Sequence, residues 1–138
     1  MQTRLNPYIS FDKEASEAID FYQSIFGGKI EKTSFKDGGM PHELADAEKI
    51  MHAMLTADND MVLMASDAPS GMERDKGSSI SISLSGDNQE ELQGYYEKLS
   101  EGGEKTLPLE KAPWGDWFGM CTDKYGVSWM VNISGAGK

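Results

Sequence analysis

The sequence predicts an α+β fold built from two copies of one βαβββ module. One observation is an internal repeat: a shift of 66 positions lays residues 51–66 on residues 117–132, with Met64 on Met130. A second is that the later copy reads as two apolar strands about a tight turn at residues 123–126. A third is that a helix-like segment ending in Gly-Gly precedes each copy. This repeat is longer than solenoid periods, so we expect two modules rather than an array.

Residues 5–11 open the first module as a short strand. Pro7 places this strand at the end or edge of a sheet, because proline gives the ladder no N–H group. Asp12 can cap the helix that follows, and Gly27-Gly28 ends that helix in the left-handed conformation open to glycine. Residues 29–35 then alternate as a half-buried strand does.

A hairpin at residues 50–66 completes the first module. The polar connection before it, residues 36–49, has the length of a lid or a disordered excursion. We place module one at about residues 4–67, a connector without periodicity at about 68–78, and module two at about 79–134. All three belong to a single domain spanning the chain.

The second module begins with the most regular strand pattern in the sequence. In residues 79–85, serines alternate with Ile80, Ile82 and Leu84, and we expect these apolar side chains beneath a helix. That helix has capping-box spacing at residues 87–90 and carries its own apolar stripe. The module is therefore strand, helix, strand, strand, strand, like the first.

Composition and charge exclude several partners. The formal net charge is -10 and the 13 basic residues are scattered, which argues against nucleic acid and against membrane surfaces. Cys121 is the one cysteine, so no internal disulfide can form, and we expect a buried, inert thiol. The beginning of the sequence lacks a secretion-signal pattern and no apolar run approaches the ~20 residues of a membrane span, so we expect a cytoplasmic protein.

Five short motifs resemble a known superfamily. They are N-P-Y-I-S-F from Asn6, E-A-I-D-F-Y from Glu17, I-F-G-G from Ile25, M-H-A from Met51 and D-K-Y-G-V-S-W from Asp123. With the module order, they resemble the vicinal oxygen chelate superfamily of glyoxalase I, extradiol dioxygenases and fosfomycin and bleomycin resistance proteins, and more narrowly its PhnB-like, 3-demethylubiquinone methyltransferase-like branch. The resemblance implies a glyoxalase-like curled mixed sheet with helices on its outer face, and a homodimer.

The resemblance also implies where a metal would bind. In the enzymes of this superfamily, His, Glu or Gln side chains on the first and fourth strands of both modules hold a divalent ion. Those positions fall here on Pro7, Met64, Ser79 or Ser81, and Met130. Proline has no donor atom, a thioether suits Cu(I), and a serine hydroxyl is a poor ligand. We therefore expect no metal and no cofactor.

The leading hypothesis is a metal-independent small-molecule binding protein that sequesters a hydrophobic or aromatic compound. Its trough would be lined by Met64, Met130, Ser79, Ser81 and His52, a partly apolar and flexible surface. The alternative for the methionines is simple core filling. The orientation of His52 is open, and so is its role as a hydrogen-bonded histidine, a general base or a displaced metal ligand.

The competing hypothesis is an enzyme, a metal-dependent lyase, isomerase or dioxygenase. Its ligands would come from His52 and from the loop of His42, Glu43 and Asp46, which are otherwise solvated loop residues. A methyltransferase is disfavoured, because the chain is short and lacks a Gly-rich loop for a nucleoside cofactor.

Overall fold

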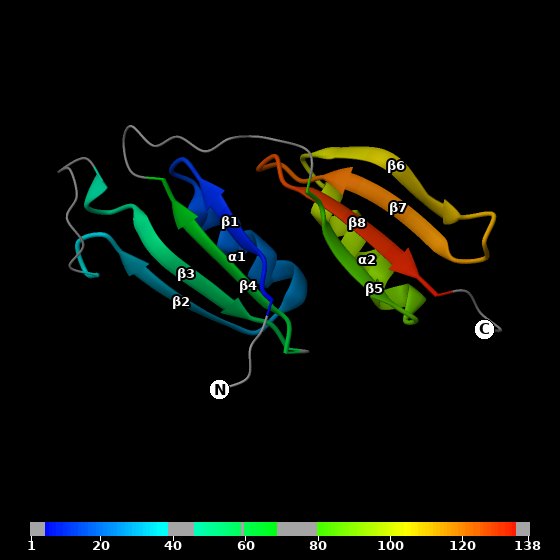
Figure 1. Ribbon diagram of the computed structural model, residues 1–138, viewed down its shortest axis with the longest axis horizontal. Coiled ribbons are helices and arrows are strands. Elements are labelled where there is room, and N and C mark those ends of the chain that lie inside the picture. The colour runs from blue at the N-terminus through cyan, green and yellow to red at the C-terminus, as the bar shows by residue number, and fades with distance from the viewer. Residues whose placement is uncertain (1–4, 39–45, 59, 69–79, 135–138) are drawn as a thin grey trace. The chain divides into compact units, whose positions relative to one another are not determined.

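A computed structural model describes residues 5–38, 46–58, 60–68 and 80–134 of the chain (Figure 1). The chain divides into two compact units, Met1–Asp75 and Lys76–Lys138. Each unit is one βαβββ module with a four-stranded mixed sheet and one helix, so the predicted α+β class with two such modules is confirmed.

The first unit places its first strand beside its last. Its elements are β1 (Tyr8–Phe11), α1 (Ala15–Phe26), β2 (Lys29–Ser34), β3 (Ile50–Thr56) and β4 (Val62–Asp67). The strand order is β1-β4-β3-β2, with β1 parallel to β4 and the other pairs antiparallel. A crossover connection that contains a helix is what a parallel pair requires, and α1 forms part of it.

The second unit repeats this topology. Its elements are β5 (Ile82–Gly86), α2 (Gln89–Ser100), β6 (Glu104–Lys111), β7 (Trp117–Thr122) and β8 (Ser128–Ile133). The strand order is β5-β8-β7-β6, and again only the first and last strands of the unit pair in parallel. In Figure 1 each helix lies behind the sheet of its own unit.

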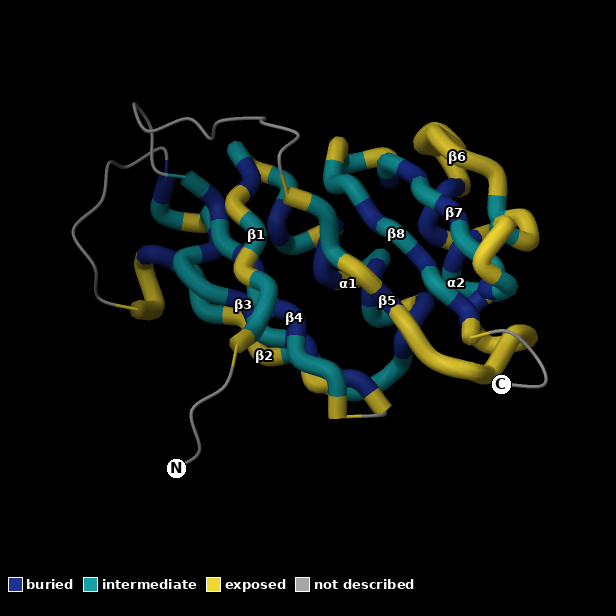
Figure 2. Tube along the Cα trace, turned by 45° about the vertical axis from the view of Figure 1, so that its right-hand side comes forward, coloured by how far each residue is buried: buried dark blue, intermediate teal, exposed yellow. Residues whose placement is uncertain are grey.

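Burial alternates along the central strands, because successive side chains point to opposite faces of a sheet. On β8, Trp129, Val131 and Ile133 are buried against α2, while the residues between them are partly exposed (Figure 2). The same alternation runs along β4. The apolar stripe of each helix supplies the other half of each core, as its spacing predicts: Ala15, Ala18, Ile19, Tyr22, Ile25 and Phe26 on α1, and Leu92, Tyr96 and Leu99 on α2.

The two helices are capped in different ways. The cap position of α1 is Glu14, not Asp12, and its side chain does not cap the helix. Instead the buried carboxylate of Asp67 on β4 accepts the Ala15 N–H at 2.9 Å. The helix α2 is capped locally by Asn88, whose Oδ1 accepts the backbone N–H of Glu91 at 3.1 Å, so the cap lies one residue after the predicted position.

The predicted strand at residues 79–85 is shifted toward its C-terminal end. Ile80 precedes β5 and is 81% exposed, so its predicted place under a helix is wrong. The reason is the partner strand: Ile82 pairs with Trp129 near the start of β8, and the residues before β8 belong to its turn. Leu84 is buried as predicted.

The predicted turn at residues 123–126 is confirmed, and one carboxylate organises it. The Asp123 carboxylate accepts the N–H groups of Tyr125 at 2.8 Å and Val127 at 3.1 Å. It also accepts the indole N–H of Trp129 at 2.9 Å, which ties the turn to the core. Gly126 has φ 85°, the left-handed conformation that the end of such a turn requires.

Candidate functional site

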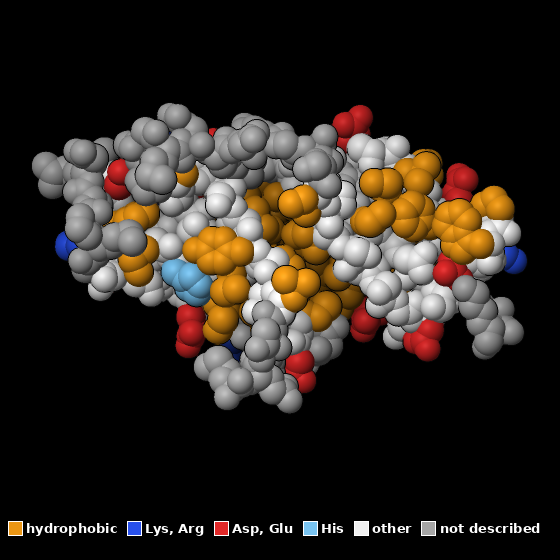
Figure 3. Space-filling model, viewed as in Figure 1, with side chains coloured by type: hydrophobic (Ala, Val, Ile, Leu, Met, Phe, Trp, Pro, Cys, Tyr) orange, Lys and Arg blue, Asp and Glu red, His pale blue; other side chains and the backbone are white. Residues whose placement is uncertain are grey.

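Methionines gather on the sheet face opposite the helix in both units. Met54 on β3 lies directly across from Met64 on β4, and Met120 on β7 lies directly across from Met130 on β8. Each of the four is partly exposed, while the residues before and after it on its strand are buried. Figure 3, seen from the same side as Figure 1, shows hydrophobic side chains on this face of both sheets. Met64 and Met130 therefore point away from the helix of their unit, as expected from strand alternation.

His52 lies on this same face, which settles the orientation that the sequence left open. Ala53, the residue between His52 and Met54, is fully buried, so both neighbours point to the other side of β3. Tyr8 on β1 pairs with Met64 and is 50% exposed. The centroids of the Tyr8 and His52 rings are 5.9 Å apart, and the ring planes are inclined by 46°. Because β4 lies between β1 and β3, the two rings approach each other across β4. We call Tyr8, His52, Met54 and Met64 the first ring-methionine cluster.

The second unit has a counterpart in which phenylalanine takes the place of histidine. Phe118 precedes Met120 by two residues on β7, so the two share a face, and Met130 lies across from Met120. Trp114, in the loop between β6 and β7, is 61% exposed, and its ring lies 6.1 Å from the Phe118 ring. We call Trp114, Phe118, Met120 and Met130 the second ring-methionine cluster.

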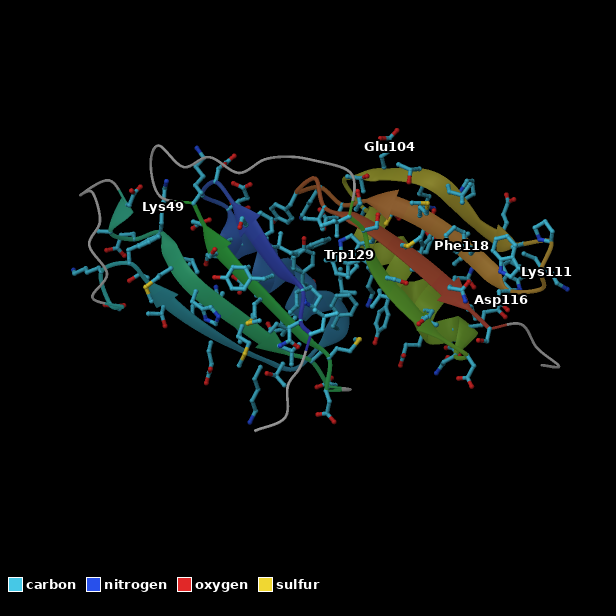
Figure 4. All side chains as sticks on the ribbon, in the orientation of Figure 1. Lys49, Glu104, Lys111, Asp116, Phe118 and Trp129 are labelled. Carbon is cyan, nitrogen blue, oxygen red and sulfur yellow. The ribbon has the colours of Figure 1, made fainter. Side chains whose placement is uncertain are left out.

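The second cluster has a polar end beside its rings. Asn132 lies across from Phe118 on β8, and its Nδ2 donates to Oδ2 of Asp116 at 3.1 Å. Asp116 is buried, and its carbonyl accepts the Ala112 N–H at 2.7 Å, which closes the loop. Figure 4 shows Lys111, Asp116 and Phe118 at this end of the hairpin. The buried Asp116 carboxylate therefore holds the partly exposed Asn132 amide beside an aromatic surface.

The structure corrects the predicted first-strand positions. Pro7 precedes β1, and its carbonyl accepts the Met64 N–H at 3.0 Å, so Tyr8 and not Pro7 is the side chain beside Met64. In the second unit Ser83, not Ser79 or Ser81, lies beside Met130. Ser81 is partly exposed just before β5, and Ser79 lies outside the described residues.

The predicted loop cluster of His42, Glu43 and Asp46 can be placed only in part. His42 and Glu43 lie outside the described residues. Asp46 is fully buried rather than solvated, and its Oδ1 lies 3.1 Å from Lys49 Nζ. Lys49 also donates to the Ala68 carbonyl at 3.3 Å, so this pair anchors the chain after β4.

The thiol of Cys121 is buried, as predicted. Burial raises the pKa of this thiol to about 11, Asp123 adds to the rise, and Lys105 opposes it. The effect of Lys105 on the pKa is the weakest of the three. Burial also raises the pKa of Tyr96, whose hydroxyl donates to the Leu107 carbonyl at 2.9 Å. Neither group is set up as a nucleophile or a base.

The side chains on these faces do not fit the divalent metal of the superfamily's enzymes. In the part of the chain that the structure describes, no three His, Cys, Asp or Glu residues gather closely enough to hold an ion. The donors on the first cluster are one imidazole, one phenol and two thioethers, and a hard divalent ion prefers carboxylate and carbonyl oxygen.

Neither helix in the described segments has the length and apolarity needed to cross a bilayer.

Sequence reasoning missed Tyr8, Met54, Phe118 and Met120. The signal for the two methionines was present, since the internal repeat aligns Met54 with Met120 and a hairpin brings each opposite its partner. Tyr8 was missed because the count along β1 was one residue short. Phe118 follows from Met120 by strand alternation.

Comparison with known proteins gives one family along almost the whole chain. The family model described as 3-demethylubiquinone-9 3-methyltransferase matches residues 3–132. The protein YjdN of Escherichia coli (strain K12) is 30% identical over an alignment that covers 94% of this chain and 94% of its own.

Solved structures agree with this match. The protein PA1353 from Pseudomonas aeruginosa is 34% identical, covers 97% of this chain and 99% of its own, and has a TM-score of 0.84. A PhnB protein from Bacillus cereus is 25% identical with a TM-score of 0.73, over 96% of this chain and 100% of its own. A glyoxylase/bleomycin resistance protein/dioxygenase domain from Frankia sp. EAN1pec is 13% identical, covers 100% of this chain and 96% of its own, and has a TM-score of 0.64, a likeness of fold alone.

Proposed function

Because the chain belongs to the PhnB-like 3-demethylubiquinone-9 3-methyltransferase family, with the glyoxalase/bleomycin resistance/dioxygenase fold, we propose that it is a small-molecule binding protein. It sequesters a hydrophobic or aromatic compound and does so without a divalent metal. Binding of this kind needs shape and apolar area, and no activated water.

The observation that carries the proposal is the pair of ring-methionine clusters. Each unit directs two thioethers and an aromatic ring to the sheet face that its helix leaves open. Methionine adapts to irregular ligands, and a sulfur–aromatic contact contributes about 0.3–1.5 kcal/mol. At the equivalent places an enzyme of the superfamily would need hard donors, and this chain has Tyr8, Met64, Ser83 and Met130.

Residues chosen from the sequence have unequal support as ligand contacts. Met64, Met130 and His52 lie on the open faces and are retained in the proposal. Ser81 is retained as a rim residue before β5. Ser83 is added, since it lies beside Met130.

A thermal-shift screen with planar aromatic compounds, run with EDTA throughout, tests the proposal. A ligand at 100 times its Kd should add about 2.7 kcal/mol of stability. We expect the response to a positive compound to fall in the double variant Met54→Ala/Met64→Ala and to persist in Met61→Ala, a methionine at the turn of the same hairpin. A flat response to the whole set would overturn the proposal.

Elemental analysis separates the binding proposal from the competing enzyme hypothesis. Elemental analysis of untagged protein purified without chelator would show stoichiometric Ni, Zn, Mn or Fe if the chain were a metal-dependent lyase, isomerase or dioxygenase. Loss of that metal in His52→Ala would replace the binding proposal with the enzymatic one. Its absence, together with ligand binding in EDTA, supports sequestration.

We propose further that the protein acts as a homodimer in the cytoplasm, without nucleic-acid or membrane partners. The net charge of -10 supports the last point, since phosphate backbones and anionic lipids repel it. A two-fold dimer is the commonest assembly among soluble homo-oligomers. Sedimentation equilibrium would give twice the mass of 15.2 kDa, and a single-chain mass would refute the dimer.

A further inference from the structure

The geometry of the first ring-methionine cluster points to a second ability: we propose that His52, Met54 and Met64 bind one soft monovalent metal ion, Cu(I) or its analogue Ag(I). The ion is distinct from the hard divalent ion of the superfamily's enzymes. The soft metal ion is not needed for binding of the organic ligand proposed above, so the two proposals are tested independently.

Strand pairing brings the three side chains together. Met54 and Met64 are directly opposite on antiparallel strands, where Cβ atoms lie about 4.5–5.5 Å apart. His52 is two residues from Met54 on the same face, so it is a diagonal neighbour of Met64, about 7–8 Å away before the side chains lean together. Methionine has three rotatable bonds between Cα and its methyl group, so both sulfur atoms can turn toward an ion beside the imidazole.

The donor types select the ion. Thioether sulfur prefers soft Cu(I), and a neutral imidazole nitrogen is the commonest metal ligand in proteins. Two thioethers and one imidazole give three neutral donors, which satisfy a monovalent ion and leave a divalent ion without the anionic oxygen it prefers. Partial exposure of all three side chains gives the ion a path from solvent.

The surroundings favour a cation at this place. Glu31 on β2 pairs with Met54, so the carboxylate starts from the strand position next to the cluster. The Tyr8 ring lies 5.9 Å from the His52 ring and presents an aromatic surface of the kind that attracts cations. The net charge of -10 adds a general attraction.

The second unit provides an internal control. Met120 and Met130 form the same cross-strand pair, but Phe118 stands where the first unit has His52. The second cluster therefore offers two thioethers and no imidazole. Exchanging the two ring residues between the units should move the binding ability with the histidine.

Titration with Cu(I) under anaerobic conditions, against a chromophoric Cu(I) chelator, tests the proposal. The reference protein is the full chain with Cys121→Ala, which removes the one thiol, and far-UV circular dichroism checks the fold of every variant. We expect one Cu(I) per chain in the reference, none in His52→Phe, and two in Phe118→His. Met54→Leu and Met64→Leu should each weaken binding by at least about tenfold, the loss seen when only a supporting partner of a metal ligand is changed.

Two further measurements make the test decisive. His42→Ala alters the other histidine of the chain and should leave the stoichiometry at one. Zn(II) in place of Cu(I) should give no binding that depends on His52. Retention of Cu(I) by a folded His52→Phe chain, its loss in His42→Ala, or the lack of a second ion in a folded Phe118→His chain would each overturn the assignment.

Discussion

Replacing Asp67 with alanine should destabilise the first unit far more than loss of an ordinary helix cap does. Oδ1 of Asp67 accepts the Ala15 N–H at 2.9 Å and Oδ2 accepts the Ile50 N–H at 2.9 Å, and all three residues are buried. One carboxylate therefore joins β4 to the start of α1 and to β3. In the second unit the repeat places Ile133 at this position, and α2 relies on its own Asn88.

The magnitude follows from the two backbone groups that lose their acceptor. A buried N–H left unpaired costs about 1–3 kcal/mol, so Asp67→Ala should lower the free energy of unfolding by roughly 2–6 kcal/mol. Asp67→Asn keeps one acceptor oxygen and should lose about half as much. Asn88→Ala, at an exposed cap, should lose only about 1 kcal/mol.

Urea unfolding followed by far-UV circular dichroism measures these differences. Tryptophan fluorescence reports only on the second unit, because Trp114, Trp117 and Trp129 all lie there. Amide hydrogen exchange at Ala15 and Ile50 should also accelerate in Asp67→Ala. The reasoning is refuted if Asp67→Ala loses no more stability than Asn88→Ala.

Three other predictions concern the second unit. Gly119→Ala should destabilise by about 1–3 kcal/mol in urea unfolding, because the added Cβ would lie 2.8 Å from Leu109 Cα on the neighbouring strand, and an unchanged midpoint would contradict this contact. The Cys121 thiol should resist alkylation at pH 8 until the protein unfolds, and rapid labelling of native protein would refute its burial. Because burial raises the pKa of this thiol from 9.0 to about 11, stability should fall as pH rises between these values, and Cys121→Ala should lessen that fall.

The parts of the fold that depend on local pattern could be predicted from the sequence. Apolar spacing gave both helices, Gly27 and Gly102 mark their ends, and the turn after Asp123 lies where predicted. Each of these signals lies within a few residues of the feature it specifies. Module order followed from the repeat, and the family resemblance followed from that order and the five short motifs.

The features that depend on pairing between distant strands could not be predicted. A strand alternates with period two, so a miscount of one residue exchanged Pro7 for Tyr8 on the candidate site. The register between β2 and β3 shifts between Thr33, which pairs with His52, and Ser34, which pairs with Ile50. The face of β3 on which His52 lies depends on this shift. The capping of Ala15 by Asp67 joins residues 52 positions apart, and nothing local indicates it.

The most direct test of the account is methyl NMR of the methionines during titration with a compound from the aromatic screen, in the presence of EDTA. The chain has 9 methionines, and labelled ε-methyl groups report on each. We expect the signals of Met54, Met64, Met120 and Met130 to shift with the ligand, and that of Met61 to stay in place. Shifts confined to other methionines, or shifts that appear only after a divalent metal replaces EDTA, would contradict a metal-independent ligand surface on the two ring-methionine clusters.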